Sequence, residues 1–198
     1  MGVGSRSQKA AQTAPISERR RVSSEAIESV AGTLLAELRS REIDTLFSVT
    51  GGPLMPLLRA AKTARFPHVI LCRHETAACL MAASYYHASG RLAAVALTSG
   101  PGAANSANGV VYALREQAAL VLLTARPPIA KVGRGAVQDF DTARFFTAIT
   151  KRSEQLYGTG SARTLVRELI ELSLAPTPGP VNLTVCADQW DLSAGGES

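Results

Sequence analysis

Two uninterrupted apolar runs, Leu92 to Leu97 and Ala118 to Thr124, constrain the fold more than any other feature of this sequence. Each has the length of a β-strand, and a strand that is apolar on both faces must be covered on both sides. Segments with the helical spacing of apolar residues lie before, between and after them. Strands and helices that alternate in this way predict an α/β fold of three layers, α/β/α, around a central, mostly parallel six-stranded sheet.

The other expected elements continue this alternation. Ser24 is the expected N-cap of the first helix, whose apolar face runs from Ile27 to Leu38, with Glu25 and Glu28 near its positive end. Further strands are expected at 45–49, 68–72, near 149–156 and at 181–185, and further helices at 53–62, 75–88, from the turn at 98–105 through 114, at 141–146 and at 162–174. Residues 125–138 have no periodicity and predict a long loop, which in a compact domain is usually functional or mobile.

The charge of the chain is concentrated at its N-terminus. Of the formal net charge of +5, residues 1–21 carry +4, so the remainder is nearly neutral and the basic balance does not indicate a nucleic-acid partner. Residues 1–23 are expected to form a disordered basic arm, because they are polar and lack periodicity. Residues 24–190 contain no linker or repeat and predict one domain, and residues 191–198 predict a flexible tail.

The cysteines and the apolar segments indicate a compartment. The three cysteines, Cys72, Cys79 and Cys186, form no C-x-x-C pair and stand in apolar runs, which is typical of reduced, buried thiols. No apolar stretch is as long as a membrane span, and the N-terminus lacks the hydrophobic region of a signal peptide. We therefore expect a cytoplasmic protein that has no membrane partner.

The spacing of several residues excludes common chemistries. His74-Glu75 begins like a zinc-protease motif, but the second histidine would have to stand where Ala78 is. The histidines at 68, 74 and 87 have no metal-ligand spacing either. The sequence also lacks G-x-S-x-G and G-x-x-x-x-G-K-[ST], so no metal site, serine hydrolase or P-loop is expected.

Glu75 follows an apolar run and opens a helical segment, so it is expected at the carboxyl end of a buried strand, in the first turn of a helix. Two glycine turns, Thr50–Pro53 and Ser99–Gly102, follow neighbouring strands. Ligands of open parallel sheets bind beyond the carboxyl ends of the strands. A glutamate in the first turn also complements the helix dipole, and glycine turns occur in every α/β protein. The combination of the three segments nevertheless predicts one converging site.

Six segments occur in a distinctive order. They are Phe47–Gly52, Arg73–Ala78, Thr98–Asn105, Gly133–Asp141, Thr150–Lys151 and Gly179–Val181. In this order they resemble the N-terminal pyrimidine-binding (PYR) domain of thiamine-diphosphate-dependent enzymes, on the acetolactate synthase side of that superfamily. The resemblance extends from Ser24 to Trp190.

This resemblance implies that the chain binds the pyrimidine half of thiamine diphosphate. In the family, the glutamate that matches Glu75 hydrogen-bonds N1′ of the aminopyrimidine and stabilises its imino tautomer, whose 4′ nitrogen removes the C2 proton of the thiazolium. A partly dehydrated carboxylate suits this role because it forms strong, charge-assisted hydrogen bonds. The residue that matches Gln138 points toward the reacting centre. The residues implied around the pyrimidine are Thr50, Gly51, Thr98, Pro101 and Asn105.

The chain also departs from the family pattern. Relatives usually carry proline where this chain has Thr50, and the paired histidines of the pyruvate decarboxylase branch are absent from residues 125–133. The G-D-G…N motif, which holds Mg²⁺ and the diphosphate in complete enzymes, is absent from all 198 residues. The resemblance therefore implies the PYR, or alpha-type, subunit of a two-component enzyme that acts on a small 2-oxo acid by decarboxylation, acetolactate synthase-like carboligation or both. A separate subunit with the diphosphate-binding domain would hold the Mg²⁺, in an expected heterotetramer.

Two other interpretations stay open. One is a non-catalytic PYR-like subunit that stabilises or regulates a partner enzyme, and the other is a piece of a longer enzyme. A degenerate subunit should lose its pyrimidine-binding residues first. Glu75, the Gly100–Gly102 turn and Gln138 are all present, which favours the catalytic interpretation.

Overall fold

The computed structural model describes residues 29–195, so the predicted basic arm and residues 196–198 lie outside the described residues. The elements alternate along the chain as expected. In chain order they are α2 (Val30–Ser40), β1 (Thr45–Val49), η2 (Gly52–Leu54), α3 (Met55–Ala64), β2 (His68–Leu71), α4 (Glu75–Ser89), β3 (Ala93–Leu97), α5 (Pro101–Asn105), α6 (Ala107–Arg115), β4 (Leu120–Arg126), η3 (Ile129–Lys131), α7 (Thr142–Phe146), β5 (Ser153–Gln155), η4 (Thr159–Ser161), α8 (Ala162–Leu174) and β6 (Pro180–Cys186), where η marks a short 3₁₀ turn.

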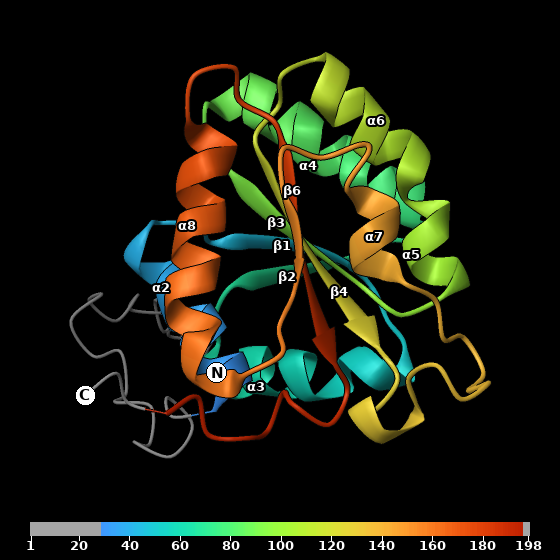
Figure 1. The fold of residues 1–198 in the computed structure, drawn as a ribbon. Coiled ribbons are helices and arrows are strands. Elements are labelled where there is room, and N and C mark those ends of the chain that lie inside the picture. Colours follow the sequence, from blue (N-terminus) through green and yellow to red (C-terminus); the bar gives the residue numbers. More distant parts are fainter. Residues whose placement is uncertain (1–28, 196–198) are drawn as a thin grey trace, which may run out of the picture.

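The strands form one six-stranded sheet in the order β2-β1-β3-β4-β6-β5, and every neighbouring pair is parallel (Figure 1). The predicted α/β fold is therefore confirmed. Because the strands are parallel, all of their carboxyl ends lie at one edge of the sheet. The chain reverses its strand order after β2, so the segments that follow β1, β2 and β3 come together at that edge.

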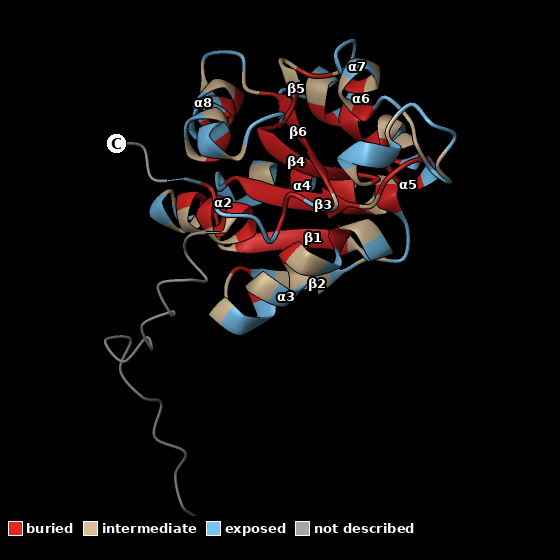
Figure 2. Ribbon diagram, turned by 60° about the horizontal axis from the view of Figure 1, so that its bottom comes forward, coloured by how far each residue is buried: buried red, intermediate tan, exposed pale blue. Residues whose placement is uncertain are grey.

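Helices cover both faces of the sheet and create two apolar cores. On β3, Ala94 and Ala96 face a core that α2, α3 and α8 complete, whereas Ala93, Val95 and Leu97 face the core under α4, α6 and α7. Figure 2 shows the central strands as buried and the outward surfaces of the helices as exposed. This alternation explains why β3 is apolar throughout and why the first four residues of β4, Leu120–Leu123, are apolar: each face of each strand is in contact with a helix.

The first described helix begins later than predicted. Ser29 has an extended backbone (φ −73°, ψ 156°), and its side chain accepts a hydrogen bond from the N–H of Gly32 at 3.1 Å. The helix that carries Leu34 and Leu38 therefore begins at Val30, and a single helix that starts at Ser24 is wrong. The periodicity extends past the true N-cap because Ile27 happens to fall in phase with the buried face.

The two outer strands also differ from their predictions. We expected residues 68–72 to form a buried strand, but β2 is an edge strand with one neighbour, and Leu71 is 66% exposed. An apolar run of four residues cannot by itself distinguish an edge strand from a central one. The strand expected near 149–156 is reduced to Ser153–Gln155, again at an edge of the sheet.

The segment after Trp190 has defined contacts over part of its length. Trp190 is fully buried, and its indole N–H donates to the carbonyl oxygen of Pro53 at 3.0 Å. Ser193 forms an isolated antiparallel bridge with Ser29, and the N–H of Val30 donates to the carbonyl oxygen of Leu192 at 2.9 Å. The flexibility expected of residues 191–198 stays a prediction.

All three cysteines are free. Cys79 and Cys186 are buried, as expected, but Cys72 is only half-buried because it follows the edge strand β2. Burial raises the pKa of the Cys79 thiol to about 12 and that of Cys186 to about 11. Among residues 29–195, no helix is both long and apolar enough to span a membrane.

Close packing of α6 on α4 fixes the helix that carries Glu75. The single helix expected after the turn at 98–105 is in fact two, α5 and α6, separated at Ser106. Gly109 of α6 lies directly against α4, because a Cβ at this position would lie 2.6 Å from the Cβ of Cys79 and 2.7 Å from the carbonyl oxygen of Thr76. Only glycine permits this approach without a shift of backbone.

Gly109→Ala should therefore lower the free energy of unfolding by about 1–3 kcal/mol, as overpacking does. Alanine gains about 1 kcal/mol of helix propensity over glycine, so any loss must arise from the contact with α4. Urea unfolding followed by circular dichroism measures the change. Gly158→Ala is the matched control, since a Cβ there meets no atom within 4 Å. A Gly109→Ala variant that is as stable as the control would contradict the close packing.

Candidate functional site

The predicted site segments meet at one edge of the sheet. Strand β1 pairs with both β2 and β3, so the turn at Thr50–Gly52, the start of α4 at Glu75 and the turn at Thr98–Gly102 follow three adjacent strands. The close approach of Gly51 to Thr98 and of Gly102 to Glu75 connects these segments directly. The three segments of the predicted converging site therefore lie at neighbouring strand ends.

Glu75 is the first residue of α4, and its environment is more enclosed than a dipole-complementing role requires. His74 is the N-cap, and its Nδ1 accepts a hydrogen bond from the N–H of Thr76 at 3.2 Å. Glu75 is 9% exposed, and its Oε2 accepts a hydrogen bond from Nδ2 of Asn105 at 3.3 Å. Thr76 holds Asn105 in turn, because its hydroxyl donates to the Asn105 carbonyl oxygen at 2.5 Å. An enclosed carboxylate with a neutral amide partner retains its capacity to accept a charged hydrogen bond.

Thr98 lies between two glycines next to Glu75. A Cβ on Gly51 would collide with the Thr98 hydroxyl, and a Cβ on Gly102 would lie 2.6 Å from Cγ2 of Thr98 and 3.3 Å from Oε1 of Glu75. The hydroxyl oxygen of Thr98 is buried and has no hydrogen-bond partner among the described residues. An unpaired buried hydroxyl is unusual, and it is most often found where a ligand or water supplies the partner.

Gln138 lies against the same turn from the other side. Its backbone has a positive φ of 67°, and a Cβ on Gly100, itself at φ 59°, would lie 2.7 Å from the Gln138 Cβ. The Ser99 hydroxyl donates to Oε1 of Gln138 at 3.3 Å. Gln138 is otherwise exposed, so its side chain is placed at the rim of the site and not inside it.

Three of the predicted cofactor-binding residues are exposed: Thr50, Pro101 and Asn105. Pro101 is exposed at the first position of α5. Thr50 is exposed and lines a separate groove of about 640 Å³ between α3 and β2, together with Met55 and Leu71. None of the other predicted site residues lines that groove.

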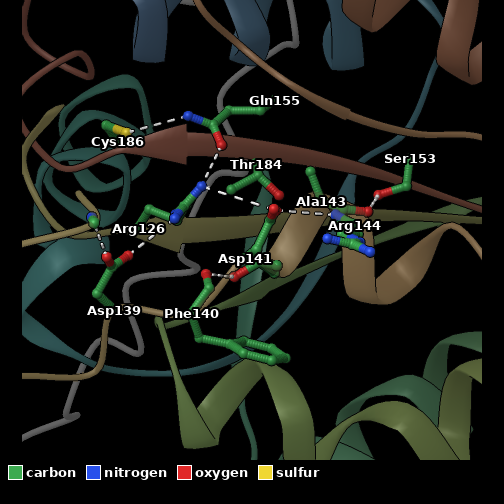
Figure 3. A network of polar contacts seen from close by, with 12 residues as sticks. Arg126, Asp139, Phe140, Asp141, Ala143, Arg144, Ser153, Gln155, Thr184 and Cys186 are labelled. Carbon is green, nitrogen blue, oxygen red and sulfur yellow. Dashed lines mark hydrogen bonds and ion pairs between the residues drawn. The ribbon is translucent and has the colours of Figure 1, made fainter. Parts of the chain in front are cut away.

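Beside the predicted residues, the structure contains a buried ion pair that the sequence analysis missed. Arg126 is the last residue of β4 and is 8% exposed. Its Nη2 contacts Oδ1 of Asp139 at 3.0 Å, and its Nη1 donates to Oε1 of Gln155 at 2.7 Å (Figure 3). Asp141 lies further away, with 3.9 Å between Nη1 and Oδ1. The sequence does contain two indications of this pair. Arg126 directly ends an apolar run, and Asp139 directly follows Gln138.

The Asp139 carboxylate uses both of its oxygens. Oδ2 accepts a hydrogen bond from the N–H of Gly133 at 2.6 Å, while Oδ1 contacts Arg126. The bond from Gly133, followed by the interaction with Arg126, lowers the pKa of Asp139 below its ordinary value despite burial, which acts in the opposite direction. Asp139 therefore stays ionised at neutral pH and joins the long loop to the sheet.

No group of three or more His, Cys, Asp or Glu side chains between residues 29 and 195 is arranged to hold a metal ion. The functional groups at this edge are instead a carboxylate, an amide and a hydroxyl, with glycines that admit close approach. Such a set can bind a flat heteroaromatic ring by charge-assisted and neutral hydrogen bonds, without a metal ligand of its own.

The fold and this edge define an α/β domain with an enclosed carboxylate at the carboxyl end of its parallel sheet. Residues 28–145 match the family described as "Thiamine pyrophosphate enzyme, N-terminal TPP binding domain", and the chain belongs to this family. Glu75, Thr98, Asn105 and Gln138 all lie within the matched segment.

Curated relatives place the chain on the acetolactate synthase side of the family, as predicted. It is 32% identical over 162 residues to a probable acetolactate synthase large subunit of Methanococcus aeolicus. This alignment covers 82% of the present chain and 27% of the relative. It is 31% identical over 155 residues to the acetolactate synthase large subunit of Lactococcus lactis subsp. lactis, with 78% and 27% covered. The corresponding figures for the acetolactate synthase isozyme 2 large subunit of Escherichia coli K12 are 30% over 151 residues, with 76% and 27% covered. The chain thus spans 27% of the length of these relatives.

The residues present fit the pyrimidine portion of thiamine diphosphate. The buried Thr98 hydroxyl lacks a partner, and the Glu75 carboxylate has an uncharged amide beside it, so both can bond to a polar heteroaromatic ring. For the Mg²⁺ that accompanies the diphosphate, which needs several oxygen ligands, residues 29–195 contain no group of three or more His, Cys, Asp or Glu side chains that could hold it.

The unpaired hydroxyl of Thr98 has a measurable consequence for stability. Thr98→Val should raise the free energy of unfolding of the chain by about 1 kcal/mol, because it replaces an unsatisfied buried hydroxyl by a methyl group of the same shape. Thr124→Val is the matched control: the Thr124 hydroxyl is buried and contacts Oδ1 of Asn182 and Oγ1 of Thr184, each at 2.9 Å. This control should lose about 1–3 kcal/mol. Urea unfolding of both variants tests the contrast, and equal losses would show that the Thr98 hydroxyl is satisfied.

The lowered pKa of Asp139 predicts how its contribution depends on pH. A carboxyl group such as that of Asp139, whose pKa is lower in the folded chain than in the unfolded chain, stabilises the fold at pH values above its pKa in the unfolded chain. This stabilisation is lost as the pH falls through the pKa of the group in the folded chain. Wild type should exceed Asp139→Asn in free energy of unfolding by about 1.5–3 kcal/mol at neutral pH. The difference should begin to shrink below about pH 4, near the ordinary pKa of an aspartate.

Urea unfolding at a series of pH values measures this difference. Asp191→Asn serves as the control. Asp191 forms an ion pair with Arg59 at 3.5 Å, but both side chains are exposed, so this pair contributes little to stability. A difference for Asp139→Asn that does not change with pH would show that the carboxylate is not held in its charged form.

Proposed function

We propose that this chain is the PYR subunit of a two-component thiamine-diphosphate-dependent enzyme that acts on a small 2-oxo acid. The observation that carries the proposal is the enclosed Glu75 carboxylate, which lies beside Asn105 and the unpaired Thr98 hydroxyl at the carboxyl edge of the sheet. Membership of the thiamine pyrophosphate enzyme family supports the choice of cofactor, and the acetolactate synthase relatives support decarboxylation, carboligation or both as the reaction.

Glu75 is the proton-handling residue in this proposal. Its carboxylate accepts a hydrogen bond from N1′ of the aminopyrimidine and stabilises a proton at that atom. Asn105 orients the carboxylate through its 3.3 Å hydrogen bond to Oε2, while Oε1 lies 3.3 Å from where a Cβ on Gly102 would be. When bound, thiamine diphosphate supplies the electron sink for cleavage and formation of carbon–carbon bonds.

The remaining predicted residues surround the ring and the substrate. Thr98 offers its buried hydroxyl, and Gly51 admits close approach of the backbone. Pro101 and Thr50 contribute from the periphery of the site. Gln138, at the rim, faces the substrate and contributes to the catalytic step through its side-chain amide.

A separate subunit supplies the diphosphate half of the site in this proposal. The support is the family match itself: residues 28–145 correspond to an N-terminal TPP binding domain. We further propose that this subunit holds the Mg²⁺, that the two chains form a heterotetramer, and that the complex works in the cytoplasm, where the three free thiols stay reduced.

Glu75→Gln tests the function directly. The variant should fold and assemble as wild type, because the side chain keeps its shape and Asn105 can still donate to the amide oxygen. Deprotonation at C2 of thiamine diphosphate should slow by at least about 100-fold, the loss expected when a positioned acid–base group is removed. Hydrogen–deuterium exchange at C2, followed by proton NMR in the complex with the diphosphate-binding subunit, measures it.

Glu42→Gln is the matched control, because Glu42 lies just before β1, at the opposite end of the strands, and is exposed. It should exchange at the wild-type rate. Equal exchange rates for Glu75→Gln and Glu42→Gln would reject the proton-handling role and favour a non-catalytic PYR-like subunit. Calorimetric titration of thiamine diphosphate into the chain alone is the second test, and micromolar, Mg²⁺-dependent binding there would refute the two-component arrangement.

A further inference from the structure

Gln138 stands on a segment that has little regular structure of its own. Between the end of β4 and the start of α7, only the three residues of η3 form a repeating hydrogen-bond pattern. Gln138 itself has a positive φ of 67°, a conformation that a non-glycine residue adopts only when its surroundings impose it. Its placement against the Ser99–Gly100 turn therefore needs an anchor outside the turn.

Asp139, the next residue, provides this anchor. One carboxylate oxygen accepts from the N–H of Gly133 at 2.6 Å and the other contacts Arg126 at 3.0 Å. Gly133 lies near the middle of the segment and Arg126 at the end of β4. A single side chain thus closes the segment upon itself and attaches it to the sheet, one peptide bond away from Gln138.

Arg126 is held on its other side by the neighbouring strands. Its Nη1 donates to Gln155 at the end of β5, and Nε2 of Gln155 contacts Sγ of Cys186 at the end of β6 at 3.8 Å (Figure 3). The carbonyl oxygen of Arg126 accepts a hydrogen bond from the N–H of Ala187 at 2.9 Å. The planar guanidinium group is therefore fixed by β5 on one side and by Asp139 on the other, a pairing that the point charge of lysine cannot reproduce.

The ion pair and the glycine turn hold Gln138 from two directions. Gly100 fits the backbone of Gln138 so closely that a Cβ there would lie 2.8 Å from its carbonyl oxygen. On the other side of the same turn, Gly102 lies next to Thr98 and Glu75. A shift of Asp139 would move Gln138 relative to the Glu75 carboxylate without altering the sheet.

We propose that Arg126 and Asp139 are positioning residues, whose buried ion pair sets the location of Gln138 against the Ser99–Gly100 turn. The effect of this ion pair on catalysis rests on the proposed function, because the location of Gln138 affects a reaction only if Gln138 belongs to an active site. The anchoring itself is a property of this chain and can be measured without cofactor or partner.

Hydrogen–deuterium exchange followed by mass spectrometry of the full chain is the experiment. In Arg126→Gln and in Asp139→Asn, backbone amides within residues 127–141 should exchange at least about 10-fold faster, because local opening becomes easier. At labelling times too short for exchange through global unfolding, amides of β3 and α4 should stay protected, as in the wild type. If Arg126→Gln does not fold, Asp139→Asn decides the result, since it preserves the shape and removes only the charge.

Arg91→Gln is the matched control. Arg91 also pairs with an aspartate, Asp44, at 2.8 Å, but both side chains are about half exposed and lie before β3 and β1, away from the loop. It should leave exchange in residues 127–141 unchanged. Unchanged exchange in Asp139→Asn, or an equal increase over the whole sheet, would overturn the proposal and leave the ion pair with a general role in stability.

A double-mutant cycle in the active complex tests the catalytic consequence. Arg126→Gln and Gln138→Ala should each lower kcat, and the double variant should lose no more than Gln138→Ala alone, because Arg126 acts through Gln138. Additive losses would overturn the positioning role. If Glu75→Gln leaves C2 exchange unchanged, the proposed function fails, while the amide exchange still decides whether the anchor exists. If amide exchange is unchanged but Glu75→Gln is inactive, only the positioning proposal fails.

Discussion

Burial of both faces of a parallel sheet is the constraint on which the rest of this structure depends. Strands β3 and β4 are covered by helices on each side, so they contain no residue that needs water until they reach their carboxyl ends. The polar residues of these two strands and of the turns that follow them lie near that edge: Thr124 and Arg126 are among the last three residues of β4, and Thr98 follows β3. At this edge a carboxylate, an amide and a guanidinium group each have hydrogen-bond or ion-pair partners.

The part of the fold that depends on local pattern could be predicted. Apolar strands alternating with amphipathic helices define the three layers, and the order of the motifs places Glu75, Thr98 and Gln138 near one edge. Features that depend on neighbouring elements could not be predicted. The three apolar residues of β2, Val69–Leu71, resemble those of a core strand, although β2 is an edge strand and Leu71 is largely exposed. The helix that became α2 was expected to begin at Ser24, because the apolar periodicity continues back to Ile27. It begins at Val30, because the backbone of Ser29 is extended.

The contacts of the long loop also could not be predicted from the local sequence pattern. Asp139 stands 13 residues after Arg126, with two prolines and two glycines between them, and no periodicity indicates that the chain returns. Only the chemistry of a charged residue at the end of an apolar run points to a buried partner, and it does not identify the partner. Gln138 could be named from the resemblance, but the Ser99 contact and the positive φ that place it come from this return.

The stacking of Gly51, Thr98 and Gly102 makes these three positions interdependent in evolution. Thr98 fills the space that either glycine would need for a side chain, so a methyl group added on one glycine is blocked while Thr98 stays as it is. A smaller residue at position 98 would have to be established first, at the expense of the buried hydroxyl. The three positions therefore form an epistatic unit, in which the order of substitutions decides which sequences a lineage can reach.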